Sequence, residues 1–128
     1  MFGKPEIMDM AAAMTVYAGI RQSAIAQNVA NADTPGYRAR DLRPFNEVYR
    51  SPDSSMRATR PGHLASGTRR DDYVVADRSG PGNLSPNGND VSIEAEMVRA
   101  AETSGQSNRA LAIYRSSLDL LRTSLGRR

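Results

Sequence analysis

The chain has 128 residues, which is enough for one domain and too few for two. Leu, Ile, Val and Phe supply only 22 of these residues, and the net charge of +3 is too low for a charged disordered coil. The lack of Cys and the single His exclude disulfides, zinc–thiolate sites, Cys nucleophiles and imidazole metal clusters. We therefore expect a chain that completes its apolar core by packing against partners.

The first residues do not have the pattern of a cleaved secretory signal. Their apolar stretch is interrupted by Asp9 and Arg21, whereas a signal has a basic start, an apolar stretch and a small-residue cleavage site. No apolar run approaches the roughly 20 residues that a membrane-spanning helix needs. We expect neither a cleaved signal nor a membrane anchor.

Residues 5–33 predict a helix with a broad apolar face. Pro5 suits the first helical position, and Glu6 favours the positive end of the helix dipole. The face consists of two neighbouring stripes with helical spacing: one contains Ile7, Met10, Met14, Tyr17, Ala24 and Asn28, and the other contains Val16, Ile20, Ala24 and Gln27. Gly19 costs about 1 kcal/mol relative to Ala inside a helix, so we expect a close neighbour beside it.

The end of this helix carries a turn signal. Thr34 precedes Pro35 and is thereby disfavoured in the α conformation, so the helix should stop near Asp33. Pro35 and Gly36 occupy the central positions of a type II turn, which requires a positive φ at Gly36 and closes at Tyr37.

Two amides precede this turn. Asn28 and Asn31 lie three residues apart, and each offers two donors and two acceptor lone pairs. Tyr37 can pack its ring back on a helix while its hydroxyl group finds a polar partner. We predict that this corner contacts a neighbouring helix of the same chain or of another one.

Residues 42–89 predict an irregular segment, because they contain five Pro and many Ser and Gly. Residues 73–76 have the composition of a short strand, and residues 45–49 fit either a strand or a turn. Residues 69–72 carry two Arg and two Asp, which suits a solvated turn or ion pairs between chains. His63 lacks a neighbouring nucleophile and acid, so we assign it a structural or solvent-facing place.

Residues 90–125 predict a second long helix, with Asp90 as its N-cap. A seven-residue repeat places two stripes on this helix, at positions 97, 104, 111, 118 and 125 and at positions 100, 107, 114 and 121. The stripes are small in the first half and large in the second. The candidate interface residues are Met97, Leu111, Tyr114, Leu118, Leu121 and Leu125.

The predicted fold class is all-α. The long N- and C-terminal helices pair as an antiparallel coiled coil, joined by an irregular segment rich in Pro, Gly and Arg with at most short strands. We divide this single domain into residues 1–41, 42–89 and 90–128. Two helices alone leave much of each apolar face in water, so we expect packing against helices of other chains.

A longer motif surrounds the turn. Asn28, Ala30, Asn31, Thr34, Pro35, Gly36 and Tyr37 form the pattern N-x-A-N-x-x-T-P-G-Y. This pattern resembles the N-terminal signature of bacterial flagellar rod, hook and hook-associated axial proteins. Residues 37–42, 59–64, 88–97 and 121–123 resemble rod subunits of that family. Thr103 and Ser107 depart from it, because relatives often carry Asn and Tyr near these positions.

The resemblance implies a structural subunit of the flagellar basal-body rod, in its proximal part, which transmits motor torque. It implies exit through the flagellar type III export apparatus and assembly in the periplasm on the membrane ring. The implied partners are other copies of the chain, the rod adaptor protein FliE and other rod subunits. No catalytic residue, cofactor, metal, nucleic acid or small-molecule substrate is implied.

Two alternatives stay open. One is a different rod subunit of the same family. The other is a helical nucleic-acid-binding or regulatory module that uses the arginine-rich middle segment; such binding would weaken steeply with salt. Six Asp and Glu residues between positions 41 and 77 count against the second alternative.

Overall fold

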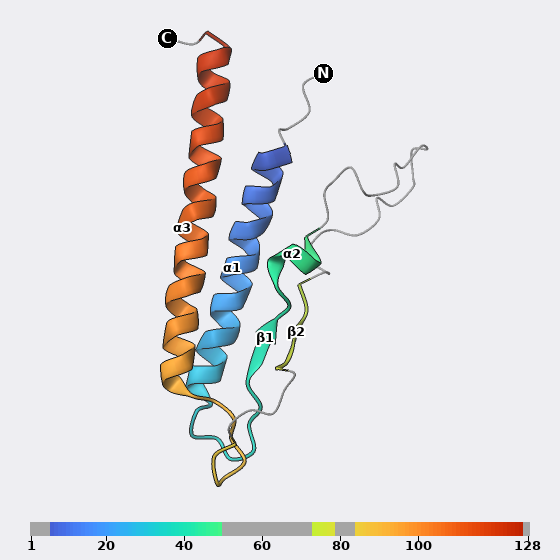
Figure 1. The fold of residues 1–128 in the computed structure, drawn as a ribbon, viewed down its shortest axis with the longest axis vertical. Helices are drawn as coiled ribbons and strands as arrows, with labels where there is room; N and C mark the ends of the chain where they lie inside the picture. The colour runs from blue at the N-terminus through green and yellow to red at the C-terminus, as the bar shows by residue number, and fades with distance from the viewer. Residues whose placement is uncertain (1–5, 50–72, 79–83, 127–128) are drawn as a thin grey trace, which may run out of the picture.

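The computed structural model describes residues 6–49, 73–78 and 84–126. Along the chain it contains α1 (Glu6–Ala30), β1 (Arg40–Leu42), α2 (Phe45–Val48), β2 (Val75–Asp77) and α3 (Ile93–Ser124) (Figure 1). The predictions made for Pro5, His63 and residues 59–64 and 69–72 lie outside the described residues. Within them, no helix is both long and apolar enough to cross a bilayer.

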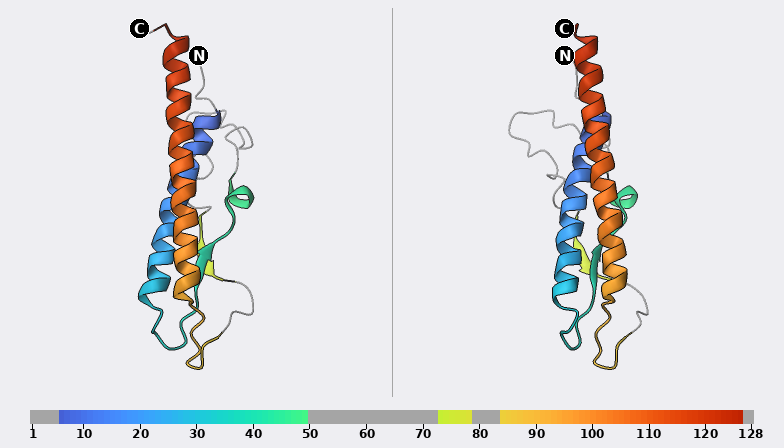
Figure 2. Two further views of the ribbon diagram at one scale, coloured as in Figure 1. Left: turned by 60° about the vertical axis from the view of Figure 1, so that its left-hand side comes forward. Right: turned by 90° about the vertical axis from the view of Figure 1, so that its left-hand side faces the viewer.

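The two long helices lie side by side and run antiparallel (Figures 1 and 2). At 1.5 Å per residue, α1 is about 38 Å long and α3 about 48 Å long, and α3 extends past the beginning of α1. The predicted all-α class, with two long terminal helices and only short strands, is confirmed.

The face of α3 that is buried differs from the predicted one. Its buried side chains are Glu96, Thr103 and Ala110, which lie seven residues apart and therefore on one face. The stripe that begins at Met97 is displaced from this face by one residue and is exposed at Met97 and Leu111. A small and polar surface, and not the large apolar stripe, therefore faces the interior of the single chain.

On α1, the apolar face is partly as predicted. Tyr17, Ala24 and Asn28 are buried, but Ile7 and Val16 are exposed. The expectation of a close neighbour at Gly19 is wrong for the described part of the single chain, since a Cβ atom added there would meet no atom within 4 Å.

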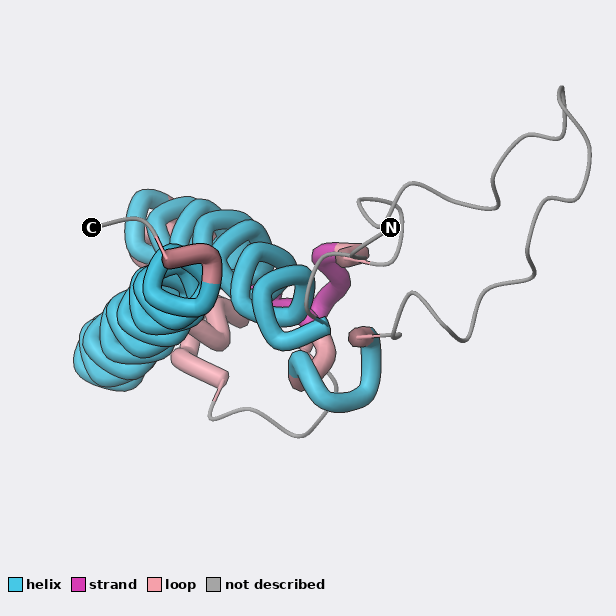
Figure 3. The backbone as a smooth tube through the Cα atoms, turned by 90° about the horizontal axis from the view of Figure 1, so that it is seen from above, coloured by secondary structure: helices cyan, strands magenta, loops and turns pink. Residues whose placement is uncertain are grey.

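A small sheet and a short helix flank the helix pair. β1 and β2 are antiparallel, with Asp41 opposite Ala76, and Figure 3 shows both strands and α2 on one side of the long helices. β2 confirms the strand expected near residues 73–76, whereas residues 45–48 form a helical turn, which was not among the alternatives. The main apolar cluster lies here and consists of Tyr17, Ala24, Leu42, Val48 and Tyr73.

Tyr17 is the centre of that cluster. Its ring contacts the ring of Phe45 edge-on at a centroid distance of 5.4 Å and that of Tyr73 at 5.7 Å. Its hydroxyl group donates a hydrogen bond of 2.9 Å to the carbonyl oxygen of Arg43. Burial raises the pKa of Tyr17 above its ordinary value of 10.0, although the neighbouring charge of Arg21 opposes this shift.

Candidate functional site

The chain leaves α1 through the predicted type II turn. The backbone N–H of Tyr37 donates to the carbonyl oxygen of Thr34 at 3.3 Å, and Gly36 has φ = 72°. Pro35 at the preceding position supplies the fixed negative φ that this turn requires. The expectations for the turn and for the conformation of Gly36 are confirmed.

Asn28 is fully buried at the last turns of α1, and its amide group makes four hydrogen bonds. The nitrogen atom donates to the carbonyl oxygen of Arg40 at 2.8 Å and to a carboxylate oxygen of Glu96 at 3.0 Å. The oxygen atom accepts from the backbone N–H of Arg40 at 2.9 Å and from the hydroxyl group of Tyr37 at 3.4 Å. Every donor and acceptor of this amide is therefore used, and one side chain joins α1, β1 and α3.

Asn31 and Thr34 act locally, unlike Asn28. The amide nitrogen of Asn31 donates to the carbonyl oxygen of Gln27 at 2.8 Å, and its oxygen accepts from the hydroxyl group of Thr34 at 3.2 Å. The carbonyl oxygen of Gln27 also accepts from the backbone N–H of Asn31 at 3.1 Å, so the main chain and the side chain of Asn31 share one acceptor at the end of the helix. The two amides of the motif thus have different roles: Asn28 makes long-range contacts and Asn31 ends its own helix.

The turn packs against a second loop, centred on Asn89, which the sequence analysis missed. Asn89 is 1% exposed, and its amide nitrogen lies 2.7–2.9 Å from the carbonyl oxygens of Asn31, Ala32 and Thr34. The backbone N–H of Gly36 donates to the carbonyl oxygen of Asn87 at 3.0 Å. We call this arrangement of residues 31–37 and 85–90 the two-loop contact. The turn signal at Asn87 and Gly88 was visible, but its partner lies more than 50 residues away.

Asp90 does not cap α3, which corrects the sequence prediction. Its carboxylate accepts from the backbone N–H of Ala39 at 3.1 Å and lies 3.7 Å from the guanidinium group of Arg38. The N-cap is Ser92, whose hydroxyl oxygen accepts from the backbone N–H of Ala95 at 3.3 Å. The N-cap is Ser92 and not Asp90, because the carboxylate of Asp90 already binds the backbone N–H of Ala39.

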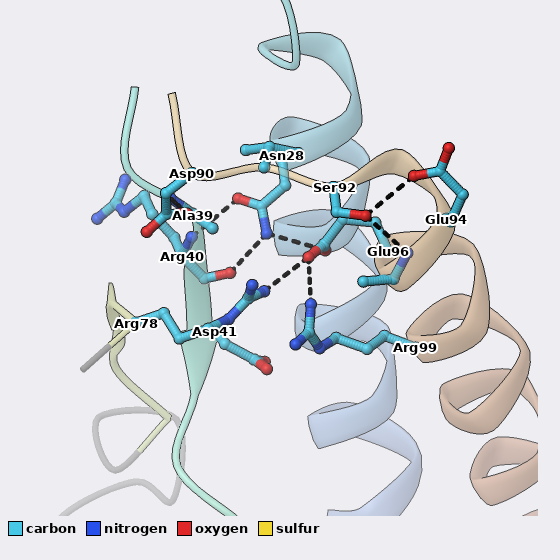
Figure 4. Close-up of polar contacts among 12 residues, drawn as sticks. Asn28, Ala39, Arg40, Asp41, Arg78, Asp90, Ser92, Glu94, Glu96 and Arg99 are labelled. Atoms are coloured by element: carbon cyan, nitrogen blue, oxygen red, sulfur yellow. Dashed lines mark hydrogen bonds and ion pairs between the residues drawn. The ribbon is translucent and has the colours of Figure 1, made fainter. Parts of the chain in front are cut away.

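Glu96 is the second functional residue that the sequence analysis missed. Its side chain is 0% exposed and accepts from Arg78 at 2.7 Å, from Arg99 at 2.6 Å and from Asn28 at 3.0 Å (Figure 4). We call these four residues the Glu96 network. It joins α1, α3 and the residue that follows β2. The sequence indicated only an acid in the first turn of α3, since nothing local identifies Arg78 as its partner.

Thr103, which departs from the family pattern, lies on the same buried face as Glu96. It is 1% exposed, and its hydroxyl group donates to the carbonyl oxygen of Arg99 at 2.7 Å. The hydroxyl group of Thr103, a smaller side chain than the Asn of the family pattern, therefore has its hydrogen-bond partner within its own helix.

The predicted interface residues of α3 are not covered by the described part of the chain. The exposed fractions are 66% for Met97, 40% for Leu111, 36% for Leu121 and 78% for Leu125. Tyr114 and Leu118 are half-buried. The prediction that these side chains pack between chains stays a prediction. A Cβ atom added at Gly105 would meet only the guanidinium group of Arg109, at 3.9 Å, among the described residues outside its own helical turn.

The polar groups of this region are engaged in structural hydrogen bonds. Within residues 6–49, 73–78 and 84–126, no group of three or more His, Cys, Asp or Glu is placed to hold a metal ion. The buried amide of Asn28 and the buried carboxylate of Glu96 are hydrogen-bonded to several elements at once, and they thereby fix the angle between the helices and the sheet.

Known proteins are similar to this chain over most of its length. Residues 17–38 match the family model described as flagella basal body rod protein. A protein of Agrobacterium fabrum named flagellar basal body rod protein FlgB is 31% identical over 107 residues, covering 79% of this chain and 78% of that protein. A protein of Cereibacter sphaeroides with the same name is 31% identical over 108 residues, covering 82% of each. The buried Asn28 and the turn at Gly36 lie inside the matched segment, and the chain belongs to the FlgB family of flagellar basal body rod proteins.

Proposed function

We propose that this structural rod protein is a subunit of the proximal rod and that it assembles with further copies of itself to transmit motor torque. The observation that supports this proposal is the apolar surface along α3. Val98, Leu120 and Leu125 are at least 60% exposed on a 32-residue helix. A soluble single chain rarely exposes large apolar side chains in such number along one element, and such a surface is typical of an interface.

The buried contacts near the start of α3 suit a subunit that transmits force. The Glu96 network and the two-loop contact connect the helix pair to the strands by hydrogen bonds that leave the buried groups of Asn28 satisfied. A buried polar group that makes all of its hydrogen bonds, as the amide of Asn28 does, favours one arrangement over its alternatives. A force applied to the strands would therefore be passed to the helices without rearrangement.

The proposal includes the partners and the location that the family suggests. The partners are the adaptor protein FliE, other rod subunits, the membrane ring and the type III export apparatus. The location is the periplasmic rod, reached without a cleaved signal peptide. No nucleic acid and no small-molecule substrate takes part.

The test is to find the chain in basal bodies. Deletion of the gene should abolish motility and leave basal bodies without a rod, and a copy with a small epitope tag in the segment of residues 50–72 should restore both. Electron microscopy of purified basal bodies labelled with an antibody to the tag should show the label at the membrane-proximal end of the rod. Labelling at the distal end would identify a different rod subunit, and intact rods in the deletion strain would contradict the proposal.

A further inference from the structure

One cleft of the molecule has no assigned role. It has a volume of about 730 Å³ and lies between the two long helices, the strands and α2. Met14 and Phe45 form apolar walls, and Arg43, Arg78, Arg99 and Gln106 supply polar groups. The cleft has room for several side chains but not for a whole helix, which is about 10 Å across.

The cleft has one more positive than negative charge: the lining residues Arg21, Arg43, Arg78 and Arg99 face the lining carboxylates of Asp41 and Asp77 and the carboxylate of Glu96. Arg78 and Arg99 both bind the single carboxylate of Glu96, so one of the two guanidinium charges is not balanced there. The exposed Arg43 forms no ion pair with any of the described residues. Arg21 adds no excess, because it forms two hydrogen bonds of 3.0 and 3.2 Å with Asp41.

Two buried polar atoms of the cleft residues have no hydrogen-bond partner within the described residues. They are the Nε atom of Arg78, a donor, and the side-chain oxygen of Gln106, an acceptor. An unpaired buried polar group is unfavourable, and a ligand that supplies the partner removes that cost. The Nε–H group of Arg78 is a donor that suits a carboxylate oxygen, whereas the oxygen of Gln106 needs a donor from elsewhere. Together with Arg43 and the apolar walls, this donor makes the cleft suited to a carboxylate with an apolar neighbour.

A surface of that chemistry lies on the same molecule. Glu94, Met97 and Val98 share one side of the first turns of α3, since residues three and four apart are neighbours on a helix. Met97 is 66% exposed and Val98 is 60% exposed, and Figure 4 shows Glu94 directed away from the Glu96 network. We call these three residues the acidic patch.

The acidic patch cannot enter the cleft of its own molecule. Arg99 and Gln106 line the cleft from α3, and at 100° per residue Val98 and Met97 lie 100° and 200° around the helix from Arg99. The two surfaces therefore face different directions. Each molecule carries one of each, which is the arrangement of a heterologous interface that repeats from copy to copy.

We propose that the cleft receives the acidic patch of a second copy of this chain. The Glu94 carboxylate lies against Arg43 and Arg78, and the side chains of Met97 and Val98 pack on the walls formed by Met14 and Phe45. This inference rests on the proposed function, because it specifies how copies contact each other within the rod.

The first test uses the absence of Cys from the natural chain. Cells that produce one copy with Asn46→Cys, at the rim of the cleft, and another with Val98→Cys should yield a disulfide-linked dimer in purified, mildly oxidised basal bodies. The control pairs Asn46→Cys with Leu120→Cys, which is 70% exposed on the same helix but outside the acidic patch. This pair should not link.

Each outcome decides a separate point. Three results would overturn the docking proposal and leave the rod function standing. Both chains could be present in basal bodies without a link, the control pair could link equally well, or the cysteine could link to another protein. Absence of both chains from basal bodies, with the cysteine-free chain also absent, would contradict the rod function itself.

The second test exchanges charges. Glu94→Arg should cause loss of motility, and adding Arg43→Glu should restore it, since the opposite charges then meet again. Glu102→Arg makes the same charge change at an exposed side chain of the same helix outside the patch and should leave motility unchanged. A Glu94→Arg strain that swims normally, or one that Arg43→Glu does not rescue, would overturn the proposed contact.

Discussion

Gly36 holds a backbone conformation that other residues avoid. Its φ of 72° lies in the left-handed region, where an L-residue loses about 1–2 kcal/mol relative to the right-handed one. The space around its missing side chain is open, so the requirement is conformational and not a matter of contacts. Gly19, in contrast, lies in a regular helix with equally open space.

This contrast makes a matched pair of substitutions. Gly36→Val should lower the melting temperature followed by circular dichroism, and the protein should be exported but should fail to join the rod, with loss of motility. Gly19→Ala should instead raise the melting temperature of the isolated chain, because Ala gains about 1 kcal/mol over Gly inside a helix. A Gly36→Val protein that melts with the natural one would show that the turn tolerates a side chain.

Glu96 offers a second prediction for a single residue. Glu96→Gln keeps the size and one acceptor but removes the charge that two guanidinium groups share, and breaking a buried ion pair costs about 3–5 kcal/mol. Denaturant unfolding of the purified chain should show this loss. Glu94→Gln, on an unburied side chain two residues earlier, should change the unfolding free energy far less. Equal effects would mean that the network contributes little.

The helices illustrate which features the sequence could predict. The end of α1, the type II turn and the length of α3 follow from local rules, because Pro35, Gly36 and the heptad repeat act within a few residues. The face of α3 that is buried within the single chain was not predicted, because it is made of Glu96, Thr103 and Ala110 and not of the largest side chains. Asn89 and Glu96 could not be found, since their partners lie far along the chain.

The second half of α3 gives a prediction for an element. Leu118 is half-buried beside the exposed Asp119, and truncation of a leucine that becomes buried costs about 2–5 kcal/mol in each copy. Leu118→Ala should therefore reduce swimming in soft agar more than Asp119→Ala does. Equal swimming of the two strains would contradict the assignment of Leu118 to an interface.

The whole molecule is unevenly stabilised along its length. One end contains the two-loop contact, the Glu96 network and the apolar cluster around Tyr17. At the other end, Leu120 and Leu125 are at least 70% exposed and α3 continues past α1. Local stability follows the number of buried contacts, so the two ends should open at different rates.

Hydrogen exchange can measure this difference. In the isolated chain, backbone amides of residues 114–124 should exchange quickly, whereas those of residues 20–30 and 99–110 should be protected. In isolated basal bodies the first group should become protected as well, because neighbouring chains cover it. Slow exchange of residues 114–124 in the dilute chain would show that α3 needs no partner.

The link between Asn28 and Glu96 spans 68 residues of chain. This has a consequence for the proposed passage through the export apparatus, in the case that the N-terminus enters first. While the first part of the chain emerges, the amide of Asn28 has no carboxylate to bind, and Asn31, Ala32 and Thr34 lack the amide of Asn89. The turn and α1 therefore cannot form these contacts before residues 89–96 have also left the channel. Residues 28–37 would then stay flexible during export and would become rigid only after α3 has followed them.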